Sequence, residues 1–169
     1  MLAMSSESPV ATSASDAASV VGSVPVDTAV AGLREIPLSD ILRFVSPVLG
    51  FENLENFAIF KTQDGPMWWL QSLDRKEIAF CLLEPFAAGI EADMEISGEE
   101  AADIGATSPS EITVMTVLVL ERDPSKIRTN LRAPILINRR TGLAKQTVLS
   151  DTQLPIRYHL KDLLKPRAQ

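Results

Sequence analysis

The sequence predicts a mainly β protein with the architecture of a sandwich or a barrel. Short apolar segments alternate with turn residues such as Asp64-Gly65 and Thr141-Gly142, and this arrangement is typical of all-β domains. Helical signals are few, and no internal repeat is visible. The 169 residues fit one domain. Apolar residues make up 46% of them and aromatic residues only 5%, so Val, Leu, Ile and Ala must fill most of the core.

The N-terminal part of the chain has a different composition. Residues 1–32 are rich in Ala, Ser and Val and contain few large side chains. Such a segment buries too little apolar surface to offset the entropy lost on ordering it. We therefore expect a disordered or weakly ordered tail over residues 1–32, or a short helix that forms on docking. The folded domain is expected over residues 33–165.

Strand patterns follow one another through this domain. The segments that carry them are 35–38, 57–61, 67–72, 78–83, 112–121, 134–137 and 146–149. Segment 112–121 has the strongest pattern, and both of its faces are largely apolar, so we place it at the centre of a sheet or barrel. Pro85 ends one strand, and Pro134 opens another at a position where proline is tolerated.

Two short helices complete the prediction. Ser97 and Glu100 have the spacing of a capping box, in which the serine oxygen accepts an N–H of the first turn and the glutamate reaches back. This predicts a helix over 98–104, ended by Gly105. A second short helix is expected over 159–164.

The charge is distributed unevenly along the chain, whose formal net charge is −6. Residues 84–111 contain eight acidic residues and no basic ones, whereas residues 122–169 contain eleven basic residues and three acidic ones. One interpretation is an acidic patch and a basic patch on different surfaces. The alternative is a set of ordinary solvated faces whose charges intermix after folding.

Residues suited to catalysis or metal binding are scarce. The single cysteine, Cys81, lies in an apolar run and is interpreted as a buried small hydrophobe that can form no internal disulfide. The single histidine, His159, is interpreted as an incidental surface or interface residue, because no hydrolase, nucleotide-binding or metalloprotease motif accompanies it. We therefore expect neither an enzyme nor a bound metal or cofactor.

No export or membrane signal is visible. The chain has no Lys or Arg before Arg34, so a signal peptide of the usual pattern is not expected. It also lacks a stretch of about 18 apolar residues that would cross a membrane. These observations favour a cytoplasmic protein.

Nucleic-acid binding is the alternative function, because the C-terminal third is basic. The residues that suggest it are Arg128, Arg132, Arg139, Arg140 and Lys145, which together would suit phosphate groups. A single-strand binder normally adds stacking aromatic side chains, yet none lies between Phe86 and Tyr158. A small β-barrel that binds nucleic acid through this third is therefore the second hypothesis.

The pair Trp68-Trp69 is the most unusual local feature. Adjacent residues of a strand point to opposite faces, so one tryptophan is expected in the core and the other on the outside. Tryptophan is enriched at binding hot spots. The outward side chain is therefore a candidate for contact with a partner.

Several segments together resemble the FliW family of flagellar assembly factors, over about residues 33–160. The matching segments are Ile41-Leu42-Arg43-Phe44, Gly50-Phe51-Glu52, Leu70-Gln71-Ser72-Leu73-Asp74, Ala79-Phe80 through Glu84-Pro85, Asn130-Leu131-Arg132-Ala133-Pro134-Ile135 and Lys145-Gln146-Thr147-Val148-Leu149. Their order and spacing are more specific than any one of them. One departure is Leu49, which stands where the family has proline before Gly50.

The resemblance implies a small closed or partly open antiparallel β-barrel with one or two short helices. It also implies two protein partners in the cytoplasm, the translational regulator CsrA and flagellin. In that family the factor binds CsrA and relieves its repression of flagellin mRNA translation, and flagellin competes as a chaperone-like partner. An acidic face formed by residues 84–111 would dock a basic partner or repel RNA from it.

The candidate site residues fall into two groups. The candidates for partner binding are Trp69, Gln71, Asp74, Glu84 and Asn130. The candidates for a structural motif are Gly50, Phe51, Trp68, Pro134 and Asn138. For Gln71, Asp74 and Asn130, an alternative is that they satisfy buried backbone groups.

Overall fold

The computed structural model describes residues 22–161, and residues 1–21 and 162–169 lie outside the described part. The elements are β1 (Ser23–Thr28), β2 (Gly32–Pro37), the 3-10 helix η2 (Leu38–Asp40), β3 (Ile41–Ser46), β4 (Asn56–Phe60), β5 (Met67–Ser72), β6 (Ala79–Leu83), α2 (Gly98–Asp103), η3 (Pro109–Glu111), β7 (Thr113–Val119), η4 (Pro124–Lys126), β8 (Arg128–Thr129), β9 (Ile135–Asn138), β10 (Leu143–Gln146) and β11 (Tyr158–His159). In the described residues none of the helices is both long and apolar enough to span a membrane.

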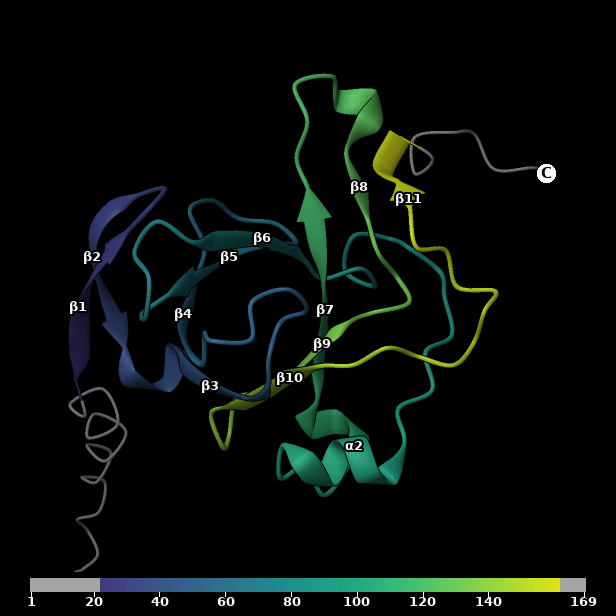
Figure 1. Ribbon diagram of the computed structural model, residues 1–169, viewed down its shortest axis with the longest axis horizontal. Coiled ribbons are helices and arrows are strands. Elements are labelled where there is room, and N and C mark those ends of the chain that lie inside the picture. The colour runs from purple at the N-terminus through teal and green to yellow at the C-terminus, as the bar shows by residue number, and fades with distance from the viewer. Residues whose placement is uncertain (1–21, 162–169) are drawn as a thin grey trace, which may run out of the picture.

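Seven of the strands close into a barrel, which confirms the predicted fold class (Figure 1). The hydrogen-bonded order is β7-β6-β5-β4-β3-β10-β9, and β9 pairs with β7 to close the ring. Every pair is antiparallel except β3 with β10, which run parallel. The end of β7 extends beyond the ring and pairs with β8, and β8 in turn pairs with β11.

The β1–β2 hairpin forms a second layer against the outside of the barrel. Val26 and Ile36 of the hairpin are buried together with Ala58 and Phe60 on the outer face of β4. Figure 1 shows the hairpin beside that part of the barrel. The predicted start of the folded domain at Leu33 is therefore wrong, because the folded part already includes β1.

The reason for this error is the alternation within β1. Val24 is half-buried, Val26 and Thr28 are buried, and the residues between them are exposed. The Thr28 hydroxyl donates to the carbonyl of Gly32 and accepts from the N–H of Ala31, which closes the turn. Composition alone hides this pattern, since the apolar residues of β1 are few and small. The rest of the predicted tail, residues 1–21, lies outside the described residues.

The core has apolar groups on both sides of the barrel wall. Inside the ring, Phe57, Leu70, Met115 and Ile135 are fully buried in one cluster. Outside the ring, a second cluster covers the other part of the wall around Cys81, Leu83, Ile90, Leu118 and Leu131. Strands buried on both faces have apolar residues at successive positions, which explains why segment 112–121 could be placed centrally.

Two local predictions need correction, and a third is confirmed. The predicted strand 146–149 begins earlier, as β10 (Leu143–Gln146), because Gly142 has φ +75° and turns the chain directly into pairing with β9. Of the helix expected over 159–164, His159 instead belongs to β11, where it pairs with Arg128. Leu160 and Lys161 form a 3-10 turn, and residues 162–164 lie outside the described residues. Helix α2 is confirmed, and the Ser97 hydroxyl accepts from the N–H of Glu100 at 3.1 Å.

Candidate protein-interaction surfaces

Trp68 and Trp69 point to opposite faces of β5, as predicted. Trp68 packs against the inner cluster, and its indole N–H donates to Glu84 at 2.6 Å. Trp69 lies on the outer face, where it contacts both the hairpin cluster and the outer cluster. It is half-buried rather than open, because the β1–β2 hairpin and the segment after β6 pack against it. Trp69 therefore stabilises the attachment of these two segments to the barrel.

Gln71 has a structural role. Its side chain is fully buried, and its carbonyl oxygen accepts from the N–H of Ala29 in the hairpin turn at 2.7 Å. Its amide nitrogen lies within donating distance of the carbonyls of Ser72, Lys76 and Ile78. The amide thus joins the hairpin to the β5–β6 turn, and this geometry favours the interpretation that Gln71 satisfies buried backbone groups.

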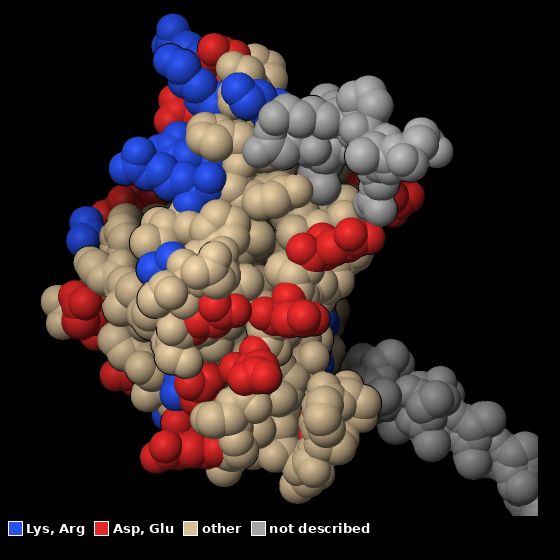
Figure 2. Space-filling model, turned by 90° about the vertical axis from the view of Figure 1, so that its right-hand side faces the viewer, with Lys and Arg blue, Asp and Glu red and all other residues tan. Residues whose placement is uncertain are grey.

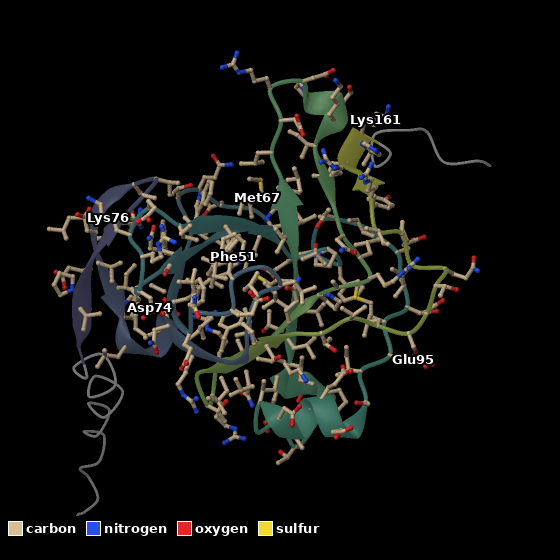
Figure 3. The ribbon with its side chains drawn as sticks, in the orientation of Figure 1. Phe51, Met67, Asp74, Lys76, Glu95 and Lys161 are labelled. Atoms are coloured by element: carbon tan, nitrogen blue, oxygen red, sulfur yellow. The ribbon has the colours of Figure 1, made fainter. Side chains whose placement is uncertain are left out.

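Asp74 completes the same turn from the solvent side (Figure 3). Its carboxylate accepts from the backbone N–H groups of Asn56 and Glu55 at 2.9 and 2.8 Å, next to the start of β4. These two bonds lower the pKa of the Asp74 carboxyl, and the bond from Asn56 has the larger effect. The Ser72 hydroxyl accepts from the N–H groups of Asp74 and Arg75. The Gln-Ser-x-Asp signature therefore builds one turn and joins it to its neighbours.

The turn after β3 and the strand β8 border an apolar groove, which we call the β8 groove. Its volume is about 290 Å³, and Leu49, Phe51, Phe80, Asn130 and Ile156 are among its lining residues. Leu49 is 58% exposed and Ile156 51% exposed. The side-chain oxygen of Asn130 accepts the N–H of Arg132 at 2.9 Å. Asn130 therefore contributes to the groove by shaping the turn after β8.

Gly50 and Phe51 belong to the turn after β3. Gly50 has φ +88°, a conformation in which glycine carries no steric penalty. Phe51 packs edge-on against Phe80 with 4.9 Å between ring centroids. The N–H of Leu49 donates to Gln146 at 2.7 Å, and that of Phe51 to the carbonyl of Val48 at 2.8 Å. The turn is therefore closed although leucine replaces the family's proline.

A larger groove lies beside α2, and we call it the α2 groove. Its volume is about 640 Å³. The apolar side chains that line it include Met94, Ile96, Ala101, Pro109, Ile112 and Val114. They come from the segment before α2, from α2 itself, and from the segment that leads into β7.

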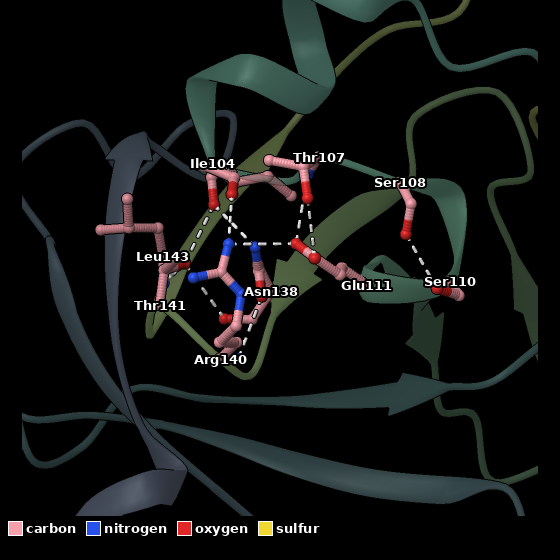
Figure 4. Close-up of polar contacts among 10 residues, drawn as sticks. Ile104, Thr107, Ser108, Ser110, Glu111, Asn138, Arg140, Thr141 and Leu143 are labelled. Carbon is pink, nitrogen blue, oxygen red and sulfur yellow. Dashed lines mark hydrogen bonds and ion pairs between the residues drawn. The ribbon is translucent and has the colours of Figure 1, made fainter.

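The β9–β10 turn fixes the end of α2 beside this groove (Figure 4). Asn138 is fully buried, and its amide donates to the carbonyl of Ile104 at 3.1 Å. Arg140 donates to the carbonyl of Gly105 at 2.8 Å and to Glu111 at 3.1 Å. Asn138 and Arg140 therefore join the β9–β10 turn to the residues that follow α2.

Glu111, the last residue of η3, joins the same network. Its carboxylate accepts from both the N–H and the hydroxyl of Thr107. The bond from the Thr107 N–H contributes most to lowering the pKa of Glu111, followed by the bonds from the Thr107 hydroxyl and from Arg140.

Acidic side chains surround the outer side of the same region. Asp93, Glu95 and Asp151 line a recess of about 280 Å³. Asp93 and Glu95 belong to the segment before α2, which also contributes Met94 and Ile96 to the α2 groove. Among the described residues, none of these three carboxylates forms an ion pair. Figure 3 places Glu95 at the outer flank of the molecule. On the face seen in Figure 2, acidic side chains occupy the middle and basic side chains gather toward the top.

The two interpretations of the charge pattern each hold for part of the chain. Asp103 pairs with Lys145 at 2.9 Å and Glu111 with Arg140, so some acidic residues of 84–111 do intermix with basic ones. Asp93, Glu95 and the exposed Glu99 remain without a basic partner among the described residues. The acidic patch therefore consists of the residues just before and at the start of α2.

The basic residues that suggested nucleic-acid binding are engaged within the fold. Arg128 pairs with Glu121, Arg139 with Asp40, and Arg140 and Lys145 with the acidic residues above. Arg132 donates to the carbonyls of Leu154 and Thr152. These side chains hold segments together, which weakens the case for a phosphate-binding face.

The described residues give no support for a metal centre. They contain no group of three or more His, Cys, Asp or Glu side chains arranged to hold a metal ion. His159 is half-buried in β11, and burial raises the pKa of the Cys81 thiol to about 11. The buried thiol is therefore protonated at neutral pH and unreactive.

Comparison with known proteins agrees with this geometry. The model of the family described as FliW protein matches residues 25–160. The chain belongs to the FliW family. The matched range includes most of the β1–β2 hairpin, so the hairpin is part of the family's domain.

Individual relatives and a solved structure support this assignment. The chain is 32% identical to the flagellar assembly factor FliW of Caldicellulosiruptor saccharolyticus over 150 residues, which covers 89% of this chain and 99% of that protein. It is 34% identical to the FliW of Syntrophus aciditrophicus over 137 residues, with 80% and 85% covered. A crystal structure of the flagellar assembly factor FliW superposes with a TM-score of 0.74 at 25% identity and covers 86% of this chain and all of that chain.

Proposed function

We propose that this FliW-family chain binds the translational regulator CsrA, relieves its repression of flagellin mRNA translation, and also binds flagellin as a chaperone-like partner. Both interactions are proposed to take place in the cytoplasm. The observation that carries the proposal is the unpaired acidic patch beside the apolar α2 groove. An RNA-binding regulator has a basic surface for phosphates, and such a surface complements unpaired carboxylates.

A second groove supports a second partner. The β8 groove lies between the turn after β3 and the strand β8, and its lining includes Arg128 rather than carboxylates. Two apolar grooves with different charges around them suit two different proteins. If binding at one groove weakens binding at the other, flagellin occupancy lowers CsrA affinity by the same factor as CsrA lowers flagellin affinity.

Purified components test this proposal. The full chain is mixed with CsrA and with flagellin in turn, and each complex is detected as a shift in molecular mass by light scattering. We expect both complexes to form, and we expect flagellin to displace CsrA. CsrA bound to the flagellin mRNA leader should release the RNA when this chain is added. Absence of both complexes would refute the proposal, and salt-sensitive binding of the RNA by this chain alone would favour the nucleic-acid alternative.

A further inference from the structure

The segment Ala92–Ile96, between β6 and α2, is extended and has no strand beside it. Its side chains alternate regularly, since Ala92, Met94 and Ile96 are half-buried while Asp93 and Glu95 are exposed. This period of two is the signature of an extended strand with one face against the protein. In Figure 1 the segment descends along the outer side of the molecule toward α2.

The backbone of this segment is unpaired. Within the described part of the chain, the N–H and C=O groups of residues 92–96 make no hydrogen bond. Bonds resume only at its ends, from Ile90 to the carbonyl of Pro85 and from Ala101 to the carbonyl of Ser97. An extended backbone with free donors and acceptors is a template for another strand.

The two faces of the segment open into two different recesses. Met94 and Ile96 line the apolar α2 groove. Asp93 and Glu95 line the acidic recess together with Asp151. A strand laid alongside would therefore place alternate side chains next to apolar groups and next to carboxylates.

We propose that Ala92–Ile96 is a docking edge to which a protein partner adds one extended segment whose residues alternate between apolar and basic. The main-chain bonds of the added strand satisfy the free backbone groups, and its side chains supply specificity. Its apolar side chains enter the α2 groove beside Met94 and Ile96. Its Lys or Arg side chains face Asp93 and Glu95, and opposite charges on neighbouring strands stabilise the pair.

Charge complementarity and the free backbone favour this occupant over two others. A helix lying in the α2 groove has no free main-chain groups in its middle, so it would leave the backbone of 92–96 unpaired. A second copy of this chain docked through the same segment would bring Asp93 and Glu95 against their own counterparts, and like charges directly opposite are destabilising. The inference depends on the proposed function only in taking the partner to be a protein.

Hydrogen exchange on the full chain tests the docking edge. The probe is a blocked peptide of alternating Lys and Val, and its control is the same peptide N-methylated at every residue, which keeps the side-chain charges and removes the backbone donors from both edges. We expect the first peptide to slow the exchange of the amides of residues 92–96, and we expect the control peptide to leave them unchanged. Equal binding of the two peptides, or binding without protection of these amides, would overturn the inference.

Charge reversal provides the second measurement. The double variant Asp93→Lys/Glu95→Lys is expected to bind the alternating peptide about tenfold more weakly. The matched control Glu55→Lys/Asp64→Lys makes the same change in net charge at exposed positions elsewhere, and it is expected to bind like the wild type. Equal weakening in both variants would overturn the inference, because it would show a general charge effect.

The same assay with CsrA and flagellin separates this inference from the proposed function. Protection of 92–96 by the peptide, with no binding of either protein, would refute the proposed function and support the docking edge. Binding of either protein without protection of these amides would support the proposed function, and it would show that the edge does not receive that protein.

Discussion

Replacing Gln71 with leucine tests whether one buried amide holds the β1–β2 hairpin against the barrel. The Gln71 side chain accepts from the N–H of Ala29 and donates toward the carbonyls of Ser72, Lys76 and Ile78. Leucine has a similar size, so the change removes hydrogen bonds without opening a large cavity. The groups left behind are a backbone donor in the hairpin turn and carbonyls in the β5–β6 turn.

The expected cost follows from the number of bonds lost. An amide nitrogen carries two hydrogens, so at most two of the three carbonyls are satisfied at once, and the bond from Ala29 makes three in total. A buried neutral hydrogen bond contributes about 1 kcal/mol, and an unsatisfied group costs more. We expect Gln71→Leu to lower the free energy of unfolding by about 3 kcal/mol, which corresponds to roughly 10 °C in Tm for a domain of this size.

Urea unfolding and hydrogen exchange together measure the effect and locate it. The matched control is Gln63→Leu, since Gln63 is exposed in the β4–β5 loop and should change stability by less than about 0.5 kcal/mol. In Gln71→Leu, the amides of β1 and β2 should exchange faster than those of β4 and β5, because the hairpin loses its bond to the barrel while the barrel stays closed. If the hairpin amides exchange no faster than in the wild type, Gln71 does not attach the hairpin and the reasoning is refuted.

Three further predictions concern single side chains. The folded-state pKa of Asp74 is lowered, so its carboxylate stabilises the fold above the unfolded pKa of about 3.9, and this contribution is lost as the pH falls through the folded-state value. The stability difference between wild type and Asp74→Ala in urea should therefore be smaller at pH 3 than at pH 7, and an equal difference would contradict this. Cys81, buried with its pKa raised to about 11, should react with iodoacetamide at pH 8 far more slowly in the folded protein than in urea, and equal rates would show that it is accessible. Asn138→Ala should lower the free energy of unfolding, measured in urea, by about 2 kcal/mol, because the buried carbonyl of Ile104 then has one hydrogen bond fewer. The exposed Asn56→Ala serves as its comparison.

The strands could be predicted from the sequence because their patterns are local. Segment 67–72 coincides with β5, and the capping box at Ser97 marks the start of α2. Local pattern did not reveal the parallel pairing of β3 with β10 or the closing pair of β7 with β9, because each joins residues far apart in the chain. The family resemblance, rather than periodicity, led to a barrel instead of a sandwich.

The candidate site residues show a similar division. Gln71 and Asp74 stand out in the sequence as polar residues beside apolar strands, and the structure explains them as partners of backbone groups in other turns. Those groups lie in the hairpin and at the start of β4, so sequence spacing could not identify them. Met94 and Ile96 were missed as groove residues. The sequence does show them alternating with Asp93 and Glu95, which is the pattern of a strand with one apolar face. Treating residues 84–111 as a single acidic segment hid this alternation.

The connection between β6 and β7 is the strongest structural reason to place function outside the barrel. These two strands are antiparallel neighbours, and such neighbours need a loop of only about 2 to 5 residues. The chain instead uses residues 84–112, which include the docking edge, α2 and most of the α2 groove lining. The barrel interior is filled by buried apolar side chains such as Phe57, Leu70 and Met115. Asn138 and Arg140 attach this connection to the β9–β10 turn by hydrogen bonds. A connection that is much longer than the strand pairing requires is typical of a segment that binds a partner.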